Sequence, residues 1–366
     1  MPLRGLVCRA VASARSTQSR AVLPLTADSW SLLQASAVFA LCALAIALGG
    51  TRLTAAVDQL ADRTGIGEAT AGAVLLGAAT SLGGSVLSVT AAWRGHPELA
   101  FSNALGGIAV QTFFLAVADM LYRRANLEHA AASAPNMMQN ALLISLLALI
   151  LIAPSLPAIT LGGVHPVTPL LLGLYLYGLR LVRGATKAPM WRPRITRETR
   201  EDRPDGASFR ASLSRLWGEF ALLMVVLGLA GWLLEPAATV IAAETGLGQT
   251  VVGVMLTAVS TSIPELVTAV AAVRRGALTL AVGGIIGGNA FDTLFTAASD
   301  VAFRDGSLYH AVPAGPQFWV ALTLLMSGIL MMGLIRRERH GFAQIGAESL
   351  AIALLYPLGV ALMLSR

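Results

Sequence analysis

A single acidic residue stands next to a proline in the middle of an apolar segment of the chain. Glu265 follows Pro264 within residues 250–273, a segment long enough to cross ~30 Å of hydrocarbon at ~1.5 Å per helical residue. Inserting a carboxylate at that depth costs roughly 3 kcal/mol, so Glu265 is a candidate functional residue. Proline removes a helix hydrogen bond and clashes with the preceding turn, which predicts a break that frees backbone oxygens beside Glu265. Broken helices of this kind form cation sites in many ion-coupled transporters.

Polar residues that suit cation binding surround Glu265. Thr261, Glu265 and Thr268 are spaced i, i+4 and i+7 and therefore share one helix face. Two hydroxyls and a carboxylate suit a hard cation that prefers oxygen ligands, although threonine hydroxyls also bond between membrane helices without binding ions. The next apolar segment carries Asn289 and Asp292 one turn apart. Glu265 and Asp292 are the predicted metal ligands, and two converging carboxylates suit a site that alternates between a proton and a cation.

The stretch that carries these residues occurs twice in the chain. Positions 64–119 align with positions 245–300 at a constant offset and without a gap, and the alignment gives 21 identities in 56 positions. The alignment is significant because polar and glycine positions match in order, whereas Ala, Leu and Val agree by chance in any two apolar spans. The matched pairs include Thr80/Thr261, Ser81/Ser262, Arg94/Arg275, Gly106/Gly287 and Asp119/Asp300. We expect Asp119 and Asp300 to be solvated helix ends.

At these positions the chain resembles the cation/calcium exchanger superfamily, which includes the sodium/calcium and calcium/proton antiporters. The two repeats of that family read approximately G-T-S-[LI]-P-E-L-V-T, then G-N, then G-[ST]-N-[IA]-[FA]-[ND]. The second repeat here matches them with TSIPELVTA from Thr261 and GGNAFD from Gly287. The resemblance implies a secondary antiporter rather than an enzyme, exchanging Ca²⁺ or another cation against Na⁺ or H⁺ by alternating access. It implies no cofactor other than these transported ions.

The first repeat departs from the family pattern. Gly83 and Gly84 stand where the family has proline and glutamate, and Ile108 stands where it has asparagine. The polar residues left in this repeat are neutral: Thr80, Ser81, Ser85, Ser88, Asn103, Gln111 and Thr112. Losing one carboxylate should weaken divalent binding more than monovalent binding, unless Asp292 takes the place of the missing acid. The alternative function is therefore a transport-inactive or monovalent-selective relative that acts as an ion-binding sensor.

The motifs of both repeats together define the predicted site. The expected cation-binding residues are Glu265, Asp292, Asn289, Thr261, Ser262, Thr80, Ser81 and Asn103, with Pro264 as the helix break.

Composition identifies the class of protein. The 366 residues are 55% hydrophobic and 13% charged, which predicts an integral membrane protein. The net charge of +6 does not indicate nucleic-acid binding, because the basic residues form short clusters between apolar segments. The expected partners are the lipid bilayer and small cations, with no protein partner. Two cysteines, Cys8 and Cys42, are too few for a disulfide framework.

The apolar segments predict an all-α polytopic membrane protein with about ten transmembrane helices. These segments are Ser31–Val57, Ala69–Trp93, Glu98–Tyr122, Ala134–Ala153, Val167–Arg183, Gly218–Ala243, Thr250–Val273, Ala277–Phe303, Phe318–Ile335 and Ile345–Leu364. Five spans separate equivalent points of the repeats, so the two halves should cross the membrane in opposite senses as inverted repeats. The predicted divisions are a tail (1–29), which is disordered or follows a mis-assigned start codon, a first half (30–183), a cytoplasmic basic linker (184–217) and a second half (218–366).

The distribution of basic residues predicts the orientation. If the N-terminus lies outside, the inner connections hold 19 of the 26 Lys and Arg residues. Because positive residues are enriched on the cytoplasmic side, both termini should face outward. We expect a multi-pass protein of a bacterial cell membrane.

Overall fold

The computed structural model describes residues 30–64, 77, 79–122, 125–187, 212–339 and 345–365. Within these ranges the chain is helical and forms no strand, apart from an isolated bridge between Leu161 and Val164. The helices of the first half are α2 (Leu32–Thr64), α4 (Leu82–Trp93), α5 (Pro97–Leu121), α6 (Leu127–Ala131), α7 (Ala134–Ile152) and α8 (Val167–Lys187). The helices of the second half are α9 (Leu213–Thr245), α10 (Gln249–Val251), α11 (Ala258–Thr261), α12 (Ile263–Arg275), α13 (Leu278–Ala302), α14 (Leu308–Ala311), α15 (Ala314–Arg336) and α16 (Ala347–Leu364).

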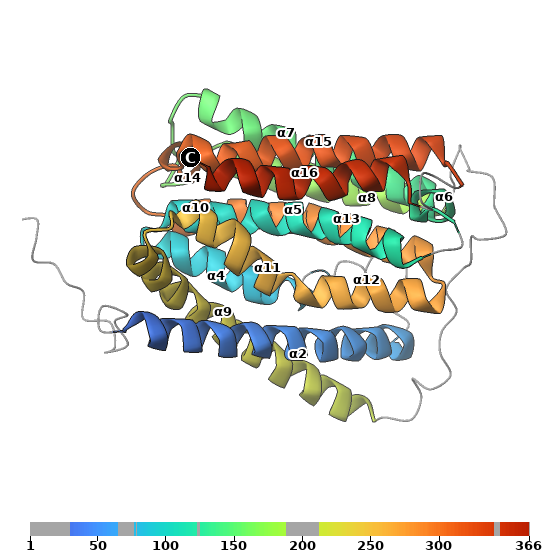
Figure 1. Ribbon diagram of the computed structural model, residues 1–366, viewed down its shortest axis with the longest axis horizontal. Coiled ribbons are helices and arrows are strands. Elements are labelled where there is room, and N and C mark those ends of the chain that lie inside the picture. Colours follow the sequence, from blue (N-terminus) through green and yellow to red (C-terminus); the bar gives the residue numbers. More distant parts are fainter. Residues whose placement is uncertain are drawn as a thin grey trace, which may run out of the picture.

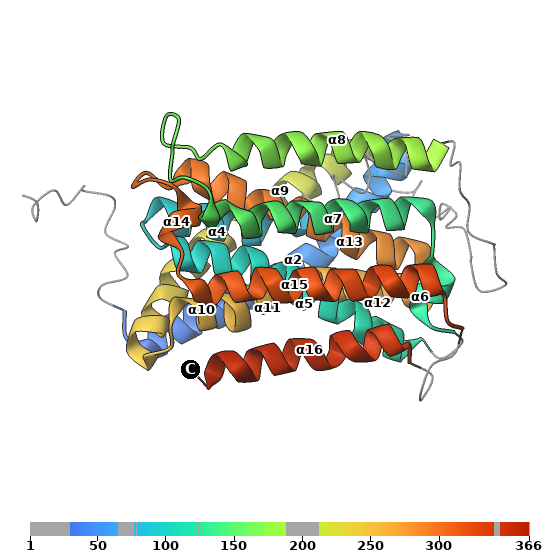
Figure 2. The ribbon, with the colours of Figure 1, turned by 90° about the horizontal axis from the view of Figure 1, so that it is seen from above.

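The long helices run roughly side by side in one bundle, with α2 and α9 along one face and α7, α8, α15 and α16 along the opposite face (Figures 1 and 2). Helices α4, α5, α12 and α13 lie between these two groups. The start of α2 and the end of α16 lie at the same end of the bundle, and α8 ends and α9 begins at the other end (Figure 1). The tail (1–29) and residues 188–211 of the linker lie outside the described residues.

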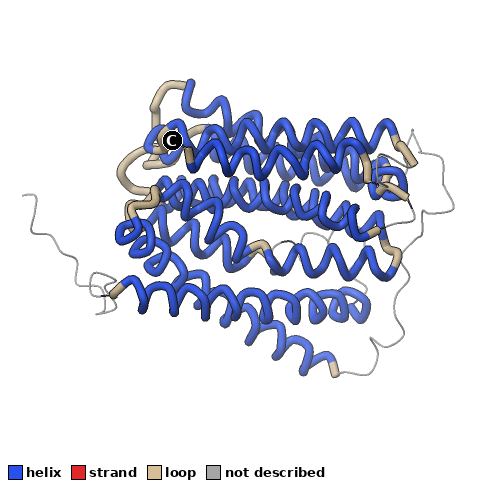
Figure 3. Tube along the Cα trace, viewed as in Figure 1, coloured by secondary structure: helices blue, strands red, loops and turns tan. Residues whose placement is uncertain are grey.

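Seven helices in the described part of the chain are long and apolar enough to cross a membrane, or eight if the bent pair Gln249–Thr261 and Ile263–Arg274 counts as one span. The chain is therefore an integral, multi-pass membrane protein. Two of the ten predicted spans, the second and the fifth, are not among these eight. Helix α4 covers only the last 12 residues of the second predicted span, and Arg180 and Arg183 make the fifth, α8, less apolar. The tube in Figure 3 shows how completely helical the bundle is.

The two repeats fold alike. Helices α5 and α13 each have 25 residues and begin at equivalent positions of the repeats, Pro97 and Leu278. The turns that precede them contain Gly95 and Gly276, whose φ angles of +83° and +84° fall in the left-handed region where an L side chain is strained. Glycine is needed at both positions because each turn must reverse the chain within a few residues.

The two aspartates expected at solvated helix ends are instead fully buried, so that expectation was wrong. Asp119 accepts hydrogen bonds from the backbone N–H groups of Leu127 (2.5 Å) and Gly346 (3.1 Å). Asp300 accepts them from the equivalent positions of the opposite repeats, Leu308 (2.9 Å) and His165 (2.8 Å). Each aspartate caps the following short helix and also binds the other half of the chain. Their burial is stable because backbone donors satisfy both oxygens.

A buried ionic group ties α9 to the turn between α4 and α5. Glu235, which is fully buried beside Pro236, accepts hydrogen bonds from Arg94 and from His96 Nδ1, the latter at 2.8 Å. The guanidinium of Arg94 also lies 5.5 Å from the ring centre of Trp232. A charge buried in this way needs such partners, so the cluster fixes the C-terminal half of α9 against the first repeat.

The chain breaks its helix directly before Glu265. A π-helical turn at Val252–Thr257 leads into α11, and the axis then bends by 45° before α12 begins at Ile263. Pro264 occupies the first turn of α12, where its missing N–H has no helical partner to lose. Glu265 therefore stands at the N-terminus of a helix, in the interior of the bundle.

Candidate functional site

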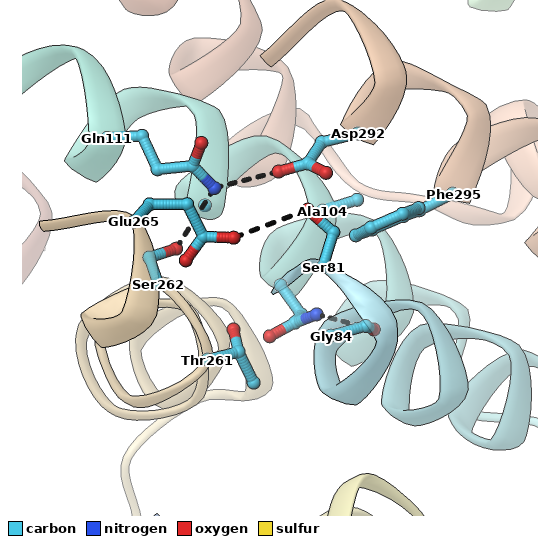
Figure 4. A pocket seen from close by; sticks show the side chains of 11 residues that line it. Ser81, Gly84, Ala104, Gln111, Thr261, Ser262, Glu265, Asp292 and Phe295 are labelled. Atoms are coloured by element: carbon cyan, nitrogen blue, oxygen red, sulfur yellow. Dashed lines mark hydrogen bonds between the residues drawn. The ribbon is translucent and has the colours of Figure 1, made fainter. Parts of the chain in front are cut away.

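A small pocket between the two halves collects most of the predicted residues (Figure 4). Helices α4 and α5 contribute one wall, and α11, α12 and α13 contribute the other. The lining residues are Ser81, Gly84, Asn103, Ala104, Gly107, Gln111, Thr261, Ser262, Glu265, Asp292 and Phe295.

Glu265 reaches across the pocket from the first turn of α12. Its side chain is buried, and its Oε1 accepts a hydrogen bond of 3.4 Å from the hydroxyl of Ser81 in the other repeat. Oε2 of Glu265 has no hydrogen-bond partner among the described residues. One oxygen of the carboxylate is therefore available to a ligand.

Asp292 enters the pocket from α13 and meets Gln111 of α5. The Gln111 amide donates hydrogen bonds to Asp292 Oδ2 at 2.8 Å and to the Ser262 hydroxyl at 3.3 Å. Gln111 and Asp292 are separated by 181 residues, so they are equivalent positions of the two repeats in direct contact. Gln111 was recognised as one neutral polar residue of the first repeat but was not among the predicted site residues.

Four buried oxygen atoms of the pocket residues lack a hydrogen-bond donor in the described part of the chain. They are Glu265 Oε2, Asp292 Oδ1, Gln111 Oε1 and Asn103 Oδ1. A buried acceptor without a partner costs about 1–3 kcal/mol, and more if it is charged. Two carboxylate and two amide side chains around one pocket therefore carry oxygen atoms of the hard kind that a cation or a proton would satisfy.

Two of the predicted residues do not line the pocket. Asn289 donates a hydrogen bond of 3.0 Å to the Thr112 hydroxyl, which joins α13 to α5 behind the site. The Thr80 hydroxyl donates to the backbone oxygen of Gly77 at 3.2 Å, although Thr80 also interacts with Glu265. The remaining six predicted cation-binding residues all face the pocket.

Gly84 stands where the first repeat of the family has an acid, and side chains of the second half lie against it. A Cβ atom on Gly84 would lie 3.4 Å from the ring of Phe295 and 3.4 Å from the Thr261 hydroxyl, which is ordinary van der Waals contact. Next to it, Gly83 packs against α9 so closely that a Cβ on Gly231 would lie 2.2 Å from the Gly83 carbonyl oxygen. The wall opposite Glu265 is thus formed by backbone and an aromatic ring.

Comparison with known proteins gives concordant results. The sequence profile of the sodium/calcium exchanger protein family matches residues 35–182 and 215–365. The putative antiporter CaxA of Alkalimonas amylolytica is 26% identical over 255 residues, which cover 69% of this chain and 76% of that protein. The inner membrane protein YrbG of Escherichia coli strain K12 is 24% identical over 279 residues, or 76% of this chain and 82% of YrbG.

Solved structures share the fold at lower identity. The H⁺/Ca²⁺ exchanger CAX superimposes with a TM-score of 0.67 at 13% identity, over 90% of this chain and 86% of that one. The sodium-calcium exchanger NCX_Mj superimposes with a TM-score of 0.56 at 17% identity, over 90% of this chain and 99% of that one.

Proposed function

Because the chain belongs to the sodium/calcium exchanger protein family, we propose that it is a secondary active antiporter that exchanges Ca²⁺ or another cation against Na⁺ or H⁺. The observation that carries this proposal is the group of four unpartnered oxygen atoms in the pocket between the halves. Two of these atoms belong to carboxylates, so the site is negative and attracts cations. The alternating-access mechanism fits a pocket whose walls come from different halves of the chain.

Glu265 and Asp292 are the proposed metal ligands. Ca²⁺ takes six to eight oxygen ligands and favours charged ones. The two carboxylates, with the amide oxygens of Gln111 and Asn103, supply the side-chain part of such a shell, and the hydroxyls of Ser81 and Ser262 stand beside them. When the cation leaves, protons can replace it on the carboxylates, which would couple its release to proton uptake.

The proposed architecture is a pair of inverted five-helix repeats, residues 30–183 and 218–366, joined by the linker 184–217. The constant offset between the repeats supports it, because the same offset relates helix boundaries, glycine turns and aspartate caps alike. The exchange of backbone hydrogen bonds between Asp119 and Gly346 and between Asp300 and His165 also supports it. An in-plane two-fold axis would convert each of these contacts into the other.

The proposed orientation places both termini outside a bacterial cell membrane. The start of α2 and the end of α16 lie at one end of the bundle, whereas α15 ends with Arg336 and Arg337 at the opposite end, where α8 also ends and α9 begins (Figure 1). The predicted enrichment of Arg and Lys at that end favours a cytoplasmic location for it.

A second candidate function follows from Gly84. The pocket has no acid from the first repeat, and Phe295 lies against that position. If Asp292 does not compensate, the site would bind a cation too weakly to drive exchange, and the protein would act as a monovalent-selective transporter or an ion-binding sensor.

Flux measurements in proteoliposomes distinguish these functions. We expect the purified protein to carry Ca²⁺ against an imposed Na⁺ or H⁺ gradient, with K⁺ as the comparison ion. Glu265→Gln should abolish this exchange, because it keeps the volume of the side chain and removes its charge. Glu219→Gln, which changes an exposed glutamate of α9, is the control and should transport normally. Exchange at the wild-type rate in Glu265→Gln would refute the proposed site.

A further inference from the structure

A second buried carboxylate lies at the end of the bundle where α6 packs against α15 and α16. Glu128 belongs to α6, between the candidate spans Pro97–Leu121 and Ala134–Ser155. Glu128 is only 4% exposed, and its Oε1 accepts a hydrogen bond from the Ser349 hydroxyl of α16. Its Oε2 is buried without any hydrogen-bond partner among the described residues. This carboxylate plays no part in the pocket of Glu265 and Asp292.

Two other acids, Asp119 and Glu348, lie near enough for their negative charges to repel that of Glu128. On α5, Asp119 is capped by two backbone N–H groups. On α16, Glu348 pairs with Arg336 of α15 at 3.5 Å, and the same arginine pairs with Glu338 at 3.3 Å.

Two further basic groups nearby, Arg337 and His129, contact backbone atoms. Arg337 donates a hydrogen bond to the His129 carbonyl oxygen at 3.1 Å. The His129 ring faces the Arg337 carbonyl oxygen at 2.7 Å. These contacts join the end of α15 to α6, next to the buried carboxyl.

The space beside Glu128 is too small for a metal ion with its ligands. A Cβ on Gly346 would lie 2.9 Å from Glu128 Oε2, and a Cβ on Gly333 would lie 3.1 Å from Glu128 Cγ and 3.1 Å from Glu348 Cβ. The two glycines therefore let α15 and α16 close directly onto the carboxyl. No group of three or more acidic, histidine or cysteine side chains in the described part of the chain is arranged to hold a metal. A proton is the ligand that fits.

We propose that Glu128 is a proton-binding site, separate from the cation pocket, which holds α6 against α15 and α16 when protonated and loosens that contact when the proton leaves. The proton satisfies the otherwise unpartnered acid and removes its repulsion with Asp119 and Glu348. The contact joins the first half of the chain to the second, so it makes that junction sensitive to pH on one side of the membrane.

The pKa of Glu128 has a value that suits this role. Burial, followed by the charge of Asp119, raises the pKa of the carboxyl from 4.5 to about 7. Because the docked form holds the proton more tightly than a solvated glutamate does, docking is favoured fully below about pH 4.5. This contribution declines as the pH rises through about 7.

The equivalent site of the second repeat supports the interpretation by contrast. Tyr309 is the repeat counterpart of Glu128, and its hydroxyl lies 3.1 Å from the hydroxyl of Thr168, the counterpart of Ser349. Burial raises the pKa of Tyr309 above the usual phenol value, so this side chain does not titrate near neutral pH. Of these two equivalent positions, only position 128 carries a carboxyl group.

Infrared spectroscopy of the carboxyl band tests the proton site in the full-length protein. In a Glu265→Gln, Asp292→Asn background, we expect a protonated-carboxyl band that titrates near pH 7 and disappears on further change of Glu128→Gln. Ser349→Ala removes a hydroxyl that stabilises the anion, so it should raise the midpoint by roughly one pH unit, whereas Thr168→Ala should not. If neither Glu128→Gln nor Ser349→Ala alters the titration near pH 7, the proposal is overturned.

Hydrogen exchange tests the loosening of the contact. After correction for the intrinsic rate, the amides of α6 should exchange faster as the pH rises from about 5 to about 8. Glu128→Gln should remove this acceleration, and Tyr309→Phe should preserve it. Equal protection of α6 at both pH values in the wild type would refute the coupling between proton and docking.

Discussion

Ser81 and Ser262 are equivalent residues of the two repeats and have nearly the same backbone angles, with φ −83° and ψ 3° for the first and φ −98° and ψ 2° for the second. After each serine a new helix begins, α4 at Leu82 and α12 at Ile263. Only the second repeat has a proline two residues after this serine, Pro264, where the first repeat has Gly83. The interruption therefore does not depend on proline alone, and the two halves differ in ligand chemistry more than in backbone shape.

The difference in chemistry is concentrated at two pairs of positions. Glu265 faces the pocket in one repeat, where the other repeat has Gly84. Asp292 has Gln111 as its counterpart, and the two side chains bond directly. Both negative charges therefore come from the second repeat, whereas the first repeat supplies donors and neutral oxygens. If this comparison is correct, the site has moved an acid from one repeat position to another and kept two charges.

The largest effect should come from removing the second charge. Asp292→Asn keeps the shape of the side chain and leaves Glu265 as the sole anion. Since each unit charge close to a divalent ion contributes several kcal/mol in a partly buried site, we expect Ca²⁺ affinity to fall at least about a hundredfold. Isothermal titration of the purified protein measures it. Unchanged Ca²⁺ affinity would show that Asp292 is not a ligand.

An intermediate effect should follow from returning the acid to the first repeat. Gly83→Pro with Gly84→Glu restores the family motif, and a Cβ at position 84 meets only ordinary contacts. In the Asp292→Asn background we expect these changes to recover about tenfold in Ca²⁺ affinity, because they supply the missing charge.

The same double change should behave differently in the presence of Asp292. There it adds a third acid to a closed pocket, and the mutual repulsion should weaken binding instead. Calorimetry of both backgrounds provides the comparison. A gain of affinity with Asp292 present would mean that the site lacks a charge, and no change in either background would mean that the first repeat does not reach the ion.

The smallest effect should come from the proline. Pro264→Ala leaves Ser262 in the conformation that Ser81 adopts without a proline. We expect transport to change by less than about threefold and the free energy of unfolding by about 1 kcal/mol or less, because alanine is tolerated in the first turn of a helix. A loss of exchange as complete as that of Glu265→Gln would show that the proline itself maintains the break.

The sequence predicts the polytopic helical fold and most of the pocket for identifiable reasons. Polar residues that recur at a fixed offset within apolar segments reveal the repeat, and Pro264 marks the helix break across which Thr261 and Glu265 line the pocket. The continuous helix face predicted for Thr261, Glu265 and Thr268 does not form, because the axis bends by 45° after Thr261 and Thr268 lies outside the pocket. The pairing of Gln111 with Asp292 could also have been inferred, because equivalent residues close to a two-fold axis must meet one another. A comparison that looks for identical residues misses this pair, because one position holds glutamine and the other aspartate.

Other features depend on packing that no linear pattern reports. In the sequence, Asp119 and Asp300 resemble residues at exposed helix ends. In the structure both are buried, and backbone N–H groups of distant segments donate hydrogen bonds to them. Asn289 has the spacing of a ligand, but its amide bonds to Thr112 outside the pocket. In each case the hydrogen-bond partner comes from a segment far away in the chain. Local sequence patterns do not show which distant segments come into contact.

The most direct test of the central claim is to locate the cation. Crystals of the protein grown with Sr²⁺ or Ba²⁺ should show an anomalous difference peak between the carboxylates of Glu265 and Asp292, within ligand distance of Gln111. The peak should vanish in Glu265→Gln crystals grown under the same conditions. A preparation that transports Ca²⁺ but shows its only ion peak outside this pocket, or keeps the pocket peak in Glu265→Gln, would contradict the account.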